Sequence, residues 1–248
     1  MHGRALLLMA MAAFPALRGD ALGDLRKALQ GLRGLEPVKG NLEYQFKSRQ
    51  GDPKAPRESQ GKAAAWVEED PSGLRIQWSR ALLDQSQEEA LARVKDPEKE
   101  APTRRAMSNL DPAEVTEVLN AGAGLLRALE GAQVLEERAE AYQGQAARFL
   151  SVKLQPRLSK RDQKYVKESQ AQGRIWVGSD GLPLAAQFET SMKGRAFLVV
   201  SFEQREKSES RFARVGGRLV TTYHRSERSG SGGGESGQTT STTTLVLR

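Results

Sequence analysis

The stretch formed by residues 173–202, GRIWVGSDGLPLAAQFETSMKGRAFLVVSF, decides the fold, because it predicts three consecutive antiparallel strands. Between Leu184 and Glu189, larger apolar residues alternate with smaller or polar ones, which is the period of a strand with one buried face. Turns are predicted at Ser179-Asp180-Gly181 and at Lys193-Gly194, since glycine tolerates the positive φ of tight hairpins.

Further strands are predicted on both sides of this stretch. Upstream, three strands are expected at residues 41–47, 60–68 and 74–79, the last two joined by a turn at residues 70–73. Downstream, Gly216-Gly217 predicts a two-residue hairpin. The remaining predicted strands cover residues 133–142, 147–156, 211–215, 218–225 and 239–248, while the polar segments 158–172 and 229–237 are expected to be exposed loops.

Helices are predicted before and within this series of strands. Residues 21–35 carry leucines at helical spacing, and residues 81–94 consist of helix formers with a thin apolar face. Asp111-Pro112-Ala113-Glu114 is a strong helix start, and the apolar stripe that follows predicts one helix over 112–129. The glycines at 122 and 124 indicate either a close approach to another backbone or a break in this helix.

The order of elements predicts the α+β class. A strongly curved antiparallel sheet, a half-barrel of about ten strands, is expected to wrap around a few helices, because long sheets twist and curl. Residues 20–248 are expected to form a single domain with a helical insertion at 81–131.

The first residues predict export. Residues 1–4 are a short basic segment, residues 5–17 are apolar, and this run is too short to cross a bilayer. We therefore expect a signal peptide over 1–19 and a periplasmic or secreted bacterial protein; the alternative is a buried N-terminal helix. The chain has no cysteine, so its stability outside the cytoplasm must come from its core.

The sequence gives little support to enzymatic or nucleic-acid-binding classes. His2 falls in the predicted signal, which leaves His224 in a polar strand where an exposed position is expected. No cofactor, catalytic residue or metal site is therefore predicted. The net charge of +7 is spread along the chain, and its basic segments are poor in aromatics, which argues against nucleic acid. Membrane contact, if any, is expected to be peripheral.

Several short runs resemble the periplasmic outer-membrane lipoprotein carriers of the LolA/LolB type. The run GKAAAWVEEDPSGLRIQW at 61–78 is similar to the second and third strands of that family, and RIWVGSDGLPLAAQFE at 174–189 with RFARVGGRLVTTY at 211–223 is similar to its later strands. The resemblance implies a half-barrel that binds a lipid or lipoprotein acyl chain. Two departures are present: the family has a basic residue before the turn proline where this chain has Glu69 and Asp70, and the insertion at 81–131 replaces a strand pair.

We expect an acyl chain to bind by hydrophobic burial in the concavity of the curved sheet, with helix 112–129 as a movable plug. The alternative is a cell-envelope interaction or structural module with a filled core, whose partner is another envelope protein. The side chains predicted to line the cavity, which would equally fill a dry core, are Trp66, Ile76, Trp78, Leu125, Phe149, Trp176 and Phe188.

Overall fold

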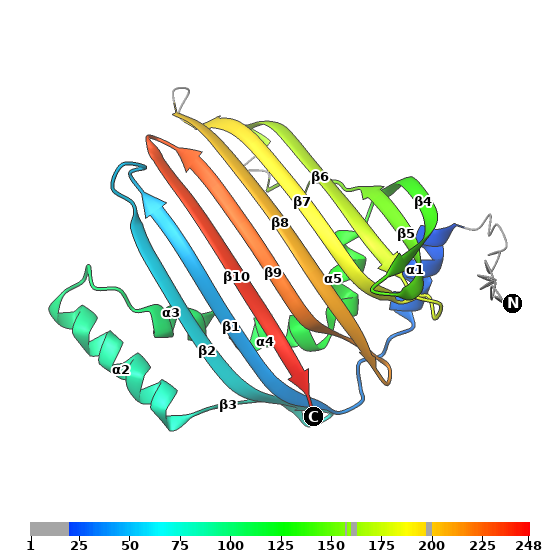
Figure 1. The fold of residues 1–248 in the computed structure, drawn as a ribbon, viewed down its shortest axis with the longest axis horizontal. Helices are drawn as coiled ribbons and strands as arrows, with labels where there is room; N and C mark the ends of the chain where they lie inside the picture. The colour runs from blue at the N-terminus through cyan, green and yellow to red at the C-terminus, as the bar shows by residue number, and fades with distance from the viewer. Residues whose placement is uncertain (1–19, 157, 160–162, 197–199) are drawn as a thin grey trace, which may run out of the picture.

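The fold is a single ten-stranded antiparallel sheet with helices on one face, seen in a computed structural model that describes residues 20–156, 158–159, 163–196 and 200–248. The strand order across the sheet is β3-β2-β1-β10-β9-β8-β7-β6-β5-β4 (Figure 1). The strands are β1 (Val38–Gly51), β2 (Arg57–Asp70), β3 (Gly73–Trp78), β4 (Gln133–Tyr142), β5 (Gln145–Lys153), β6 (Val166–Val177), β7 (Pro183–Ala196), β8 (Val200–Val215), β9 (Arg218–Gly232) and β10 (Glu235–Leu247).

Five helices accompany the sheet in the described part of the chain. They are α1 (Ala21–Gln30), α2 (Arg80–Lys95), α3 (Pro102–Ser108), α4 (Pro112–Leu119) and α5 (Ala121–Ala128), and the last four lie between β3 and β4. None of these helices has the length and apolar character that crossing a bilayer requires. The predicted α+β class with a curved, open antiparallel sheet of ten strands is confirmed.

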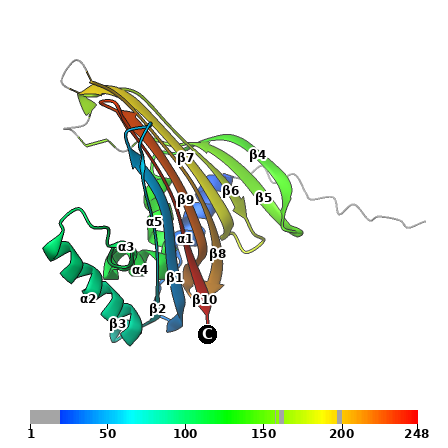
Figure 2. The same ribbon diagram turned by 60° about the vertical axis from the view of Figure 1, so that its left-hand side comes forward.

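The sheet joins two meanders through its last strand. β10 pairs with β1 along almost its whole length, from Gly40 opposite Leu247 to Gly51 opposite Ser236, and its other side pairs with β9. The C-terminal strand therefore closes the gap between the first three strands and the other six. The sheet bends around α1, α3, α4 and α5, which all lie on its concave side (Figure 2).

Two apolar clusters fill the space between the concave face and these helices. The first, which we call the α1–α5 cluster, joins the two helices to strands β5, β6, β7 and β9. The second, the α3–α4 cluster, joins those helices to β1, β2, β9 and β10. Their most buried members are Leu25, Leu29, Leu129, Leu150 and Ile175 in the first, and Leu42, Val67, Leu110, Val115 and Leu119 in the second.

Several strand boundaries predicted from the sequence are wrong, and most of the predicted strands are too short; the strand predicted over 147–156 instead runs past the end of β5 at Lys153. No turn occurs at Lys193-Gly194, because β7 continues to Ala196. The predicted loop at 158–172 contains the start of β6 at Val166, and the Gly/Ser segment 229–237 belongs to β9 and β10 apart from a turn at Gly233-Gly234. Neighbouring strands pair with these polar backbones, on both sides in β9 and β10 and through β7 alone at residues 166–171 of β6, so the segments stay extended despite weak intrinsic strand propensity.

The helix predictions need two corrections. The single helix expected over 112–129 is divided at Asn120, whose φ of −138° and ψ of 58° are not helical, so that α4 and α5 are separate. The first helix ends at Gln30 instead of Leu35. Asp111 caps α4 as expected, since its carboxylate accepts from the backbone N–H groups of Ala113 and Glu114. Residues 1–19 lie outside the described residues, so the predicted signal peptide is not tested.

Candidate functional site

The helices cover only part of the concave face, and the uncovered part forms a trough. In Figure 1 the central strands continue well past the helices, toward the turns that connect them. The trough holds about 800 Å³ and is open to solvent. We call it the open trough; it lies on β10, β9, β8 and β7, with α3, α4 and β1 along one side.

The floor of the open trough consists of small polar residues in register across the strands. One row runs from Thr243 through His224 to Ser210, and the next runs from Ser241 through Ser226 to Ser208. Further along, Thr239 lies opposite Arg228, which lies opposite Glu206, and Gly237 lies opposite Gly230. Because residues of one row share a face of the sheet, this register places hydroxyl groups side by side over three strands.

Side-chain contacts fix the charged groups of this floor. Glu206 pairs with Arg228 at 2.9 Å and accepts a hydrogen bond from the Ser226 hydroxyl at 3.2 Å. His224 Nδ1 lies 2.9 Å from the Ser210 hydroxyl. Burial lowers the pKa of His224, and Arg228 acts in the same direction, while Glu206 opposes it. His224 is therefore half-buried and uncharged near neutral pH, which corrects the exposed position expected from the sequence.

The helix side of the open trough is also mixed in charge. The Arg105 guanidinium lies 4.2 Å from the centre of the Phe46 ring and donates to the Ser48 hydroxyl at 3.1 Å. Burial raises the pKa of Glu114, and the neighbouring Glu117 and Asp111 carboxylates raise it further. Burial likewise raises the pKa of Tyr44, which lies opposite Thr243 and whose ring centre is 6.3 Å from that of Phe46. The trough lining thus carries three arginines, Arg105, Arg205 and Arg228, and the two carboxylates of Glu114 and Glu206, and Arg205 is paired with Glu189 outside the lining.

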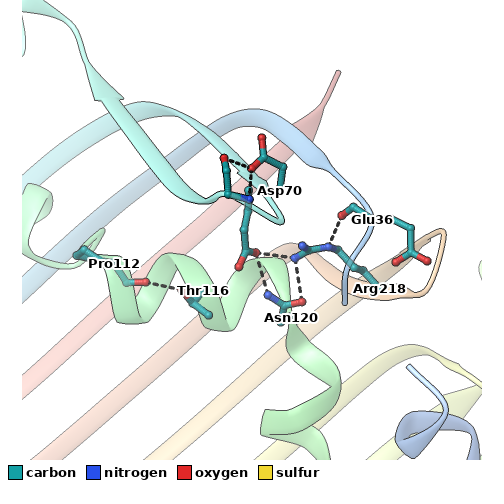
Figure 3. A network of polar contacts seen from close by, with 8 residues as sticks. Glu36, Asp70, Pro112, Thr116, Asn120 and Arg218 are labelled. Carbon is teal, nitrogen blue, oxygen red and sulfur yellow. Dashed lines mark hydrogen bonds and ion pairs between the residues drawn. The ribbon is translucent and has the colours of Figure 1, made fainter. Parts of the chain in front are cut away.

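A buried polar cluster holds the helices against the sheet at the break between α4 and α5 (Figure 3). The Arg218 side chain is only 2% exposed, and its guanidinium donates to the Glu69 carboxylate at 2.5 Å and to Asn120 Oδ1 at 3.0 Å. Asn120 also donates to Glu69 at 2.9 Å, and Arg218 Nε donates to the backbone carbonyl of Glu36. We call these four residues the polar clasp. It connects β9, β2, the helix break and the segment before β1.

The seven side chains predicted to line one cavity lie in four different places. Ile76 and Trp78 pack against the α3–α4 cluster, whereas Leu125 and Phe188 belong to or pack against the α1–α5 cluster. Phe149 and Trp176 lie together on the convex face with their rings 5.4 Å apart. Trp66 also points to the convex face, because it alternates with the buried Ala65 and Val67.

The polar residues of the open trough were not predicted from the sequence, because an acyl-chain site was expected to be lined by apolar side chains. A signal was present in the sequence, since the run TTSTTT at 239–244 and the small polar residues at 226–232 occur close together in the chain. Two adjacent antiparallel strands made of such residues place hydroxyls on a common face. No three histidine, aspartate or glutamate side chains in the described part of the chain form a group that could hold a metal ion.

Comparisons with known proteins do not identify the chain. No family model matches it, and no curated protein matches it. One solved structure, described as "Crystal structure of MucB in complex with MucA(peri)", is similar at 10% identity and covers 92% of this chain and 93% of that chain, with a TM-score of 0.20. A TM-score this low carries no argument about fold or function. The lipoprotein-carrier family is not confirmed.

Proposed function

We propose that this chain is a non-enzymatic interaction module of the cell envelope, and that a polar segment of a partner protein lies in the open trough. The observation that supports this proposal is the contrast within one concave face. The part under the helices is filled by buried leucine, isoleucine and valine side chains, whereas the open part is a solvent-filled trough with a polar floor. A concave surface that remains open is the surface available to a partner.

The chemistry of the trough favours a polar partner without a large net charge. Serine and threonine hydroxyls both donate and accept hydrogen bonds, so rows of them can satisfy the amide groups of a peptide. The pairing of Arg228 with Glu206 leaves this part of the floor close to neutral. A strongly acidic or basic partner would gain little there, because each charge it brings meets charges of both signs.

The absence of catalysis is part of the proposal. Ser210 and His224 are in contact, but the carboxylate of Glu206 is engaged by Ser226 and Arg228 and does not orient the imidazole in the way a triad requires. The contact instead satisfies a half-buried imidazole in the trough floor. Location in the periplasm is likewise proposed, on the strength of the apolar leader in the sequence.

Site-specific photo-crosslinking in the exported protein tests this function. A photoreactive phenylalanine analogue at Thr239 faces the trough, and the same analogue at Gln238 faces the opposite side of the same strand. We expect a discrete protein adduct from position 239 only, and its loss when Ser241→Trp fills the trough. Equal crosslinking from both positions, or none from position 239, would contradict the proposal.

A second candidate, acyl-chain binding, is favoured by the division of the helical segment. α4 and α5 cover the apolar half of the concave face and meet at Asn120, where the polar clasp holds them. Movement of α5 would uncover the α1–α5 cluster and create an apolar site. In this arrangement Arg218 of β9 places a cation beside Glu69. The lipoprotein-carrier family has its basic residue near this position, before the turn proline.

Native mass spectrometry of the purified protein, with lipid extraction of the same sample, separates the two candidates. A stoichiometric adduct of lipid mass that disappears in Gly122→Leu would favour the acyl-chain candidate, because a side chain at Gly122 meets Leu32 at the α1–α5 contact. An adduct-free protein that does not shift a fluorescent fatty acid would leave the interaction module.

A further inference from the structure

A second binding surface lies at the edge of the sheet, away from the open trough. β3 pairs only with residues 65–70 of β2, from Trp78 opposite Ala65 to Gly73 opposite Asp70. The chain then leaves the sheet at Ser79 and turns into α2. Within the described residues, positions 57–64 of β2 therefore have a strand partner on one side only, which is β1.

This edge is regular, in contrast to the opposite edge of the sheet. The pairing of β2 with β1 runs without a register shift from Arg57 to Glu69. β4, at the other edge, has an irregularity between Val134 and Glu136 and carries an ion-paired arginine, Arg138. Bulges protect an edge from pairing with other chains, and the unpaired part of β2 has none. It does carry charged residues, and its Arg57 and Ser59 side chains contact Glu98 and Glu100.

A groove lies beside the unpaired part of β2. It holds about 950 Å³ and is lined by residues 60–64 of β2, by α2 and by the start of α3. We call it the edge groove. Its β2 side carries the residues 60–64, of which Gly61 faces the Pro102 carbonyl of α3 and Ala63 is buried. The small residues therefore accommodate α3 on the concave face, while the edge of the strand has no strand partner among the described residues. The helical side is formed by Ser79, Leu82, Gln85, Pro102 and Thr103.

The α2 helix forms an outer wall of the edge groove and reaches the core only through Leu82, which is partly buried against the α3–α4 cluster. No residue of α2 is fully buried. It is attached to α3 instead, because the Glu89 carboxylate accepts from the backbone N–H groups of Thr103 and Arg104 at 3.1 and 3.0 Å. This contact caps α3 from another helix and holds α2 away from the strand edge.

We propose that the edge groove binds an extended segment of a partner protein as an additional strand on β2. Residues 57–64 offer an edge of roughly 26 Å, at about 3.3 Å per residue, which is enough for an octapeptide. Side chains of that strand would alternate between two environments. One set faces Leu82 and Pro102 on the helical side, and the other faces the convex side, where Lys62 of β2 lies nearest to the added strand.

These environments select the sequence of the partner segment. Small apolar residues fit the helical side, and acidic residues fit the convex side beside Lys62, whose ammonium group also pairs with Glu43. We therefore expect a segment that alternates apolar and acidic residues. This site does not depend on the open trough, because the two surfaces share no lining residue.

Binding of a labelled octapeptide, VEVEVEVE, to the full chain tests the proposal by fluorescence anisotropy. Gln85→Trp fills the groove from its helical side, and we expect it to weaken binding by about tenfold or more. Gln87→Trp, two residues along the same exposed helix and outside the groove, is the matched control and should bind as the wild type does. A peptide with proline at alternate positions should bind poorly, because proline donates no backbone hydrogen bond.

Charge and location provide two further readouts. Lys62→Glu should shift preference toward the peptide VKVKVKVK, whereas Lys54→Glu in the β1–β2 turn should not. Amide exchange should slow in residues 57–64 and remain unchanged in β4. Equal binding by the two tryptophan variants, equal binding of the proline peptide, or no binding at about millimolar peptide would each overturn the proposal.

Discussion

The concave face consists of two halves built on the same strands, and they differ in chemistry along each strand. On β10, Leu245 is buried beneath α4, while Thr243, Ser241 and Thr239 continue the same face into the open trough. On β9, Val220 is fully buried, while His224, Ser226 and Arg228 line the open trough further along the strand. The pairing of β9 with β8 shifts register between the two halves, where Arg211 lies opposite Tyr223 and Phe212 opposite Thr221.

This contrast shows that the helices, and not the sheet, determine which part of the face must be apolar. A strand needs an apolar side chain only where a helix excludes water from that face. Beyond the helices the strand is held by backbone pairing on both sides, so hydroxyl groups are tolerated. The residue at which a strand changes from leucine or valine to serine or threonine thus marks the end of helical cover.

Substitution of Arg218 should have the largest effect on stability, because it is the central residue of the polar clasp in the covered half. Arg218→Met leaves the Glu69 carboxylate and Asn120 without their shared donor, and we expect a loss of about 3–5 kcal/mol in the free energy of unfolding. Urea denaturation measures this loss.

The double variant Arg218→Met/Glu69→Leu is the control for that prediction. It removes the buried carboxylate together with its partner, so it should recover much of the lost stability. A double variant as unstable as the sum of the two single variants would show that the pair acts independently, and that the clasp does not couple β9 to β2.

Truncation in the apolar half comes next. Leu245→Ala removes a side chain that is 4% exposed beneath the α3–α4 cluster, and we expect it to cost about 2–4 kcal/mol. Thr239→Ser on the same strand and the same face should cost less than about 0.5 kcal/mol, because that position is open. Similar losses at the two positions, measured by urea denaturation, would contradict the division of the face into a filled and an open half.

Two glycines give a third comparison between the halves. A Cβ at Gly61 would lie 2.4 Å from the carbonyl oxygen of Pro102, so Gly61→Ala must push α3 away from β2 and should cost about 1–3 kcal/mol. A Cβ at Gly230 in the open trough would meet its nearest atom at 3.4 Å, and Gly230→Ala should be within about 0.5 kcal/mol of the wild type. Thermal unfolding of both variants checks the difference; a stable Gly61→Ala protein would mean that α3 does not pack tightly.

The elements that the sequence predicts well are those with a local cause. The turns at Gly181 and at Gly216-Gly217 and the helix start at Asp111 follow from backbone conformation and capping, and the structure confirms each of them. The division of the helical stripe at Asn120 was not predicted. Its cause is distant in the chain, because Asn120 leaves the helical conformation where it meets Glu69 and Arg218.

The candidate site was harder to predict than the fold for a related reason. An apolar side chain such as Trp176 or Phe188 indicates that the residue is buried. Which residues it packs against depends on the strand order, and these two lie in different clusters. The trough residues carry no apolar alternation, so their common face appears only when β10 is paired with β9 and β9 with β8. Contacts between strands that are distant in the sequence leave no periodic pattern of residue types in the sequence itself.

The smallest predicted effect on stability concerns His224, whose side chain lines the open trough. Burial lowers its pKa below the ordinary value of 6.5, so the unfolded chain binds a proton more readily than the folded chain does. The free energy of unfolding should therefore fall as the pH is lowered through about 6.5, with the loss complete below the folded-state pKa. His224→Gln keeps a polar side chain beside Ser210 and removes this titration.

Chemical denaturation of both proteins at about pH 8 and about pH 6 measures the difference, since carboxylates with ordinary pKa values stay ionised over this range. We expect the wild type to lose more stability than His224→Gln on going to the lower pH. An equal loss would place the imidazole in a solvated environment similar to that of the unfolded chain. The reverse order would mean that Glu206, which favours the charged imidazole, outweighs burial and Arg228, and that the floor of the open trough carries a net negative field.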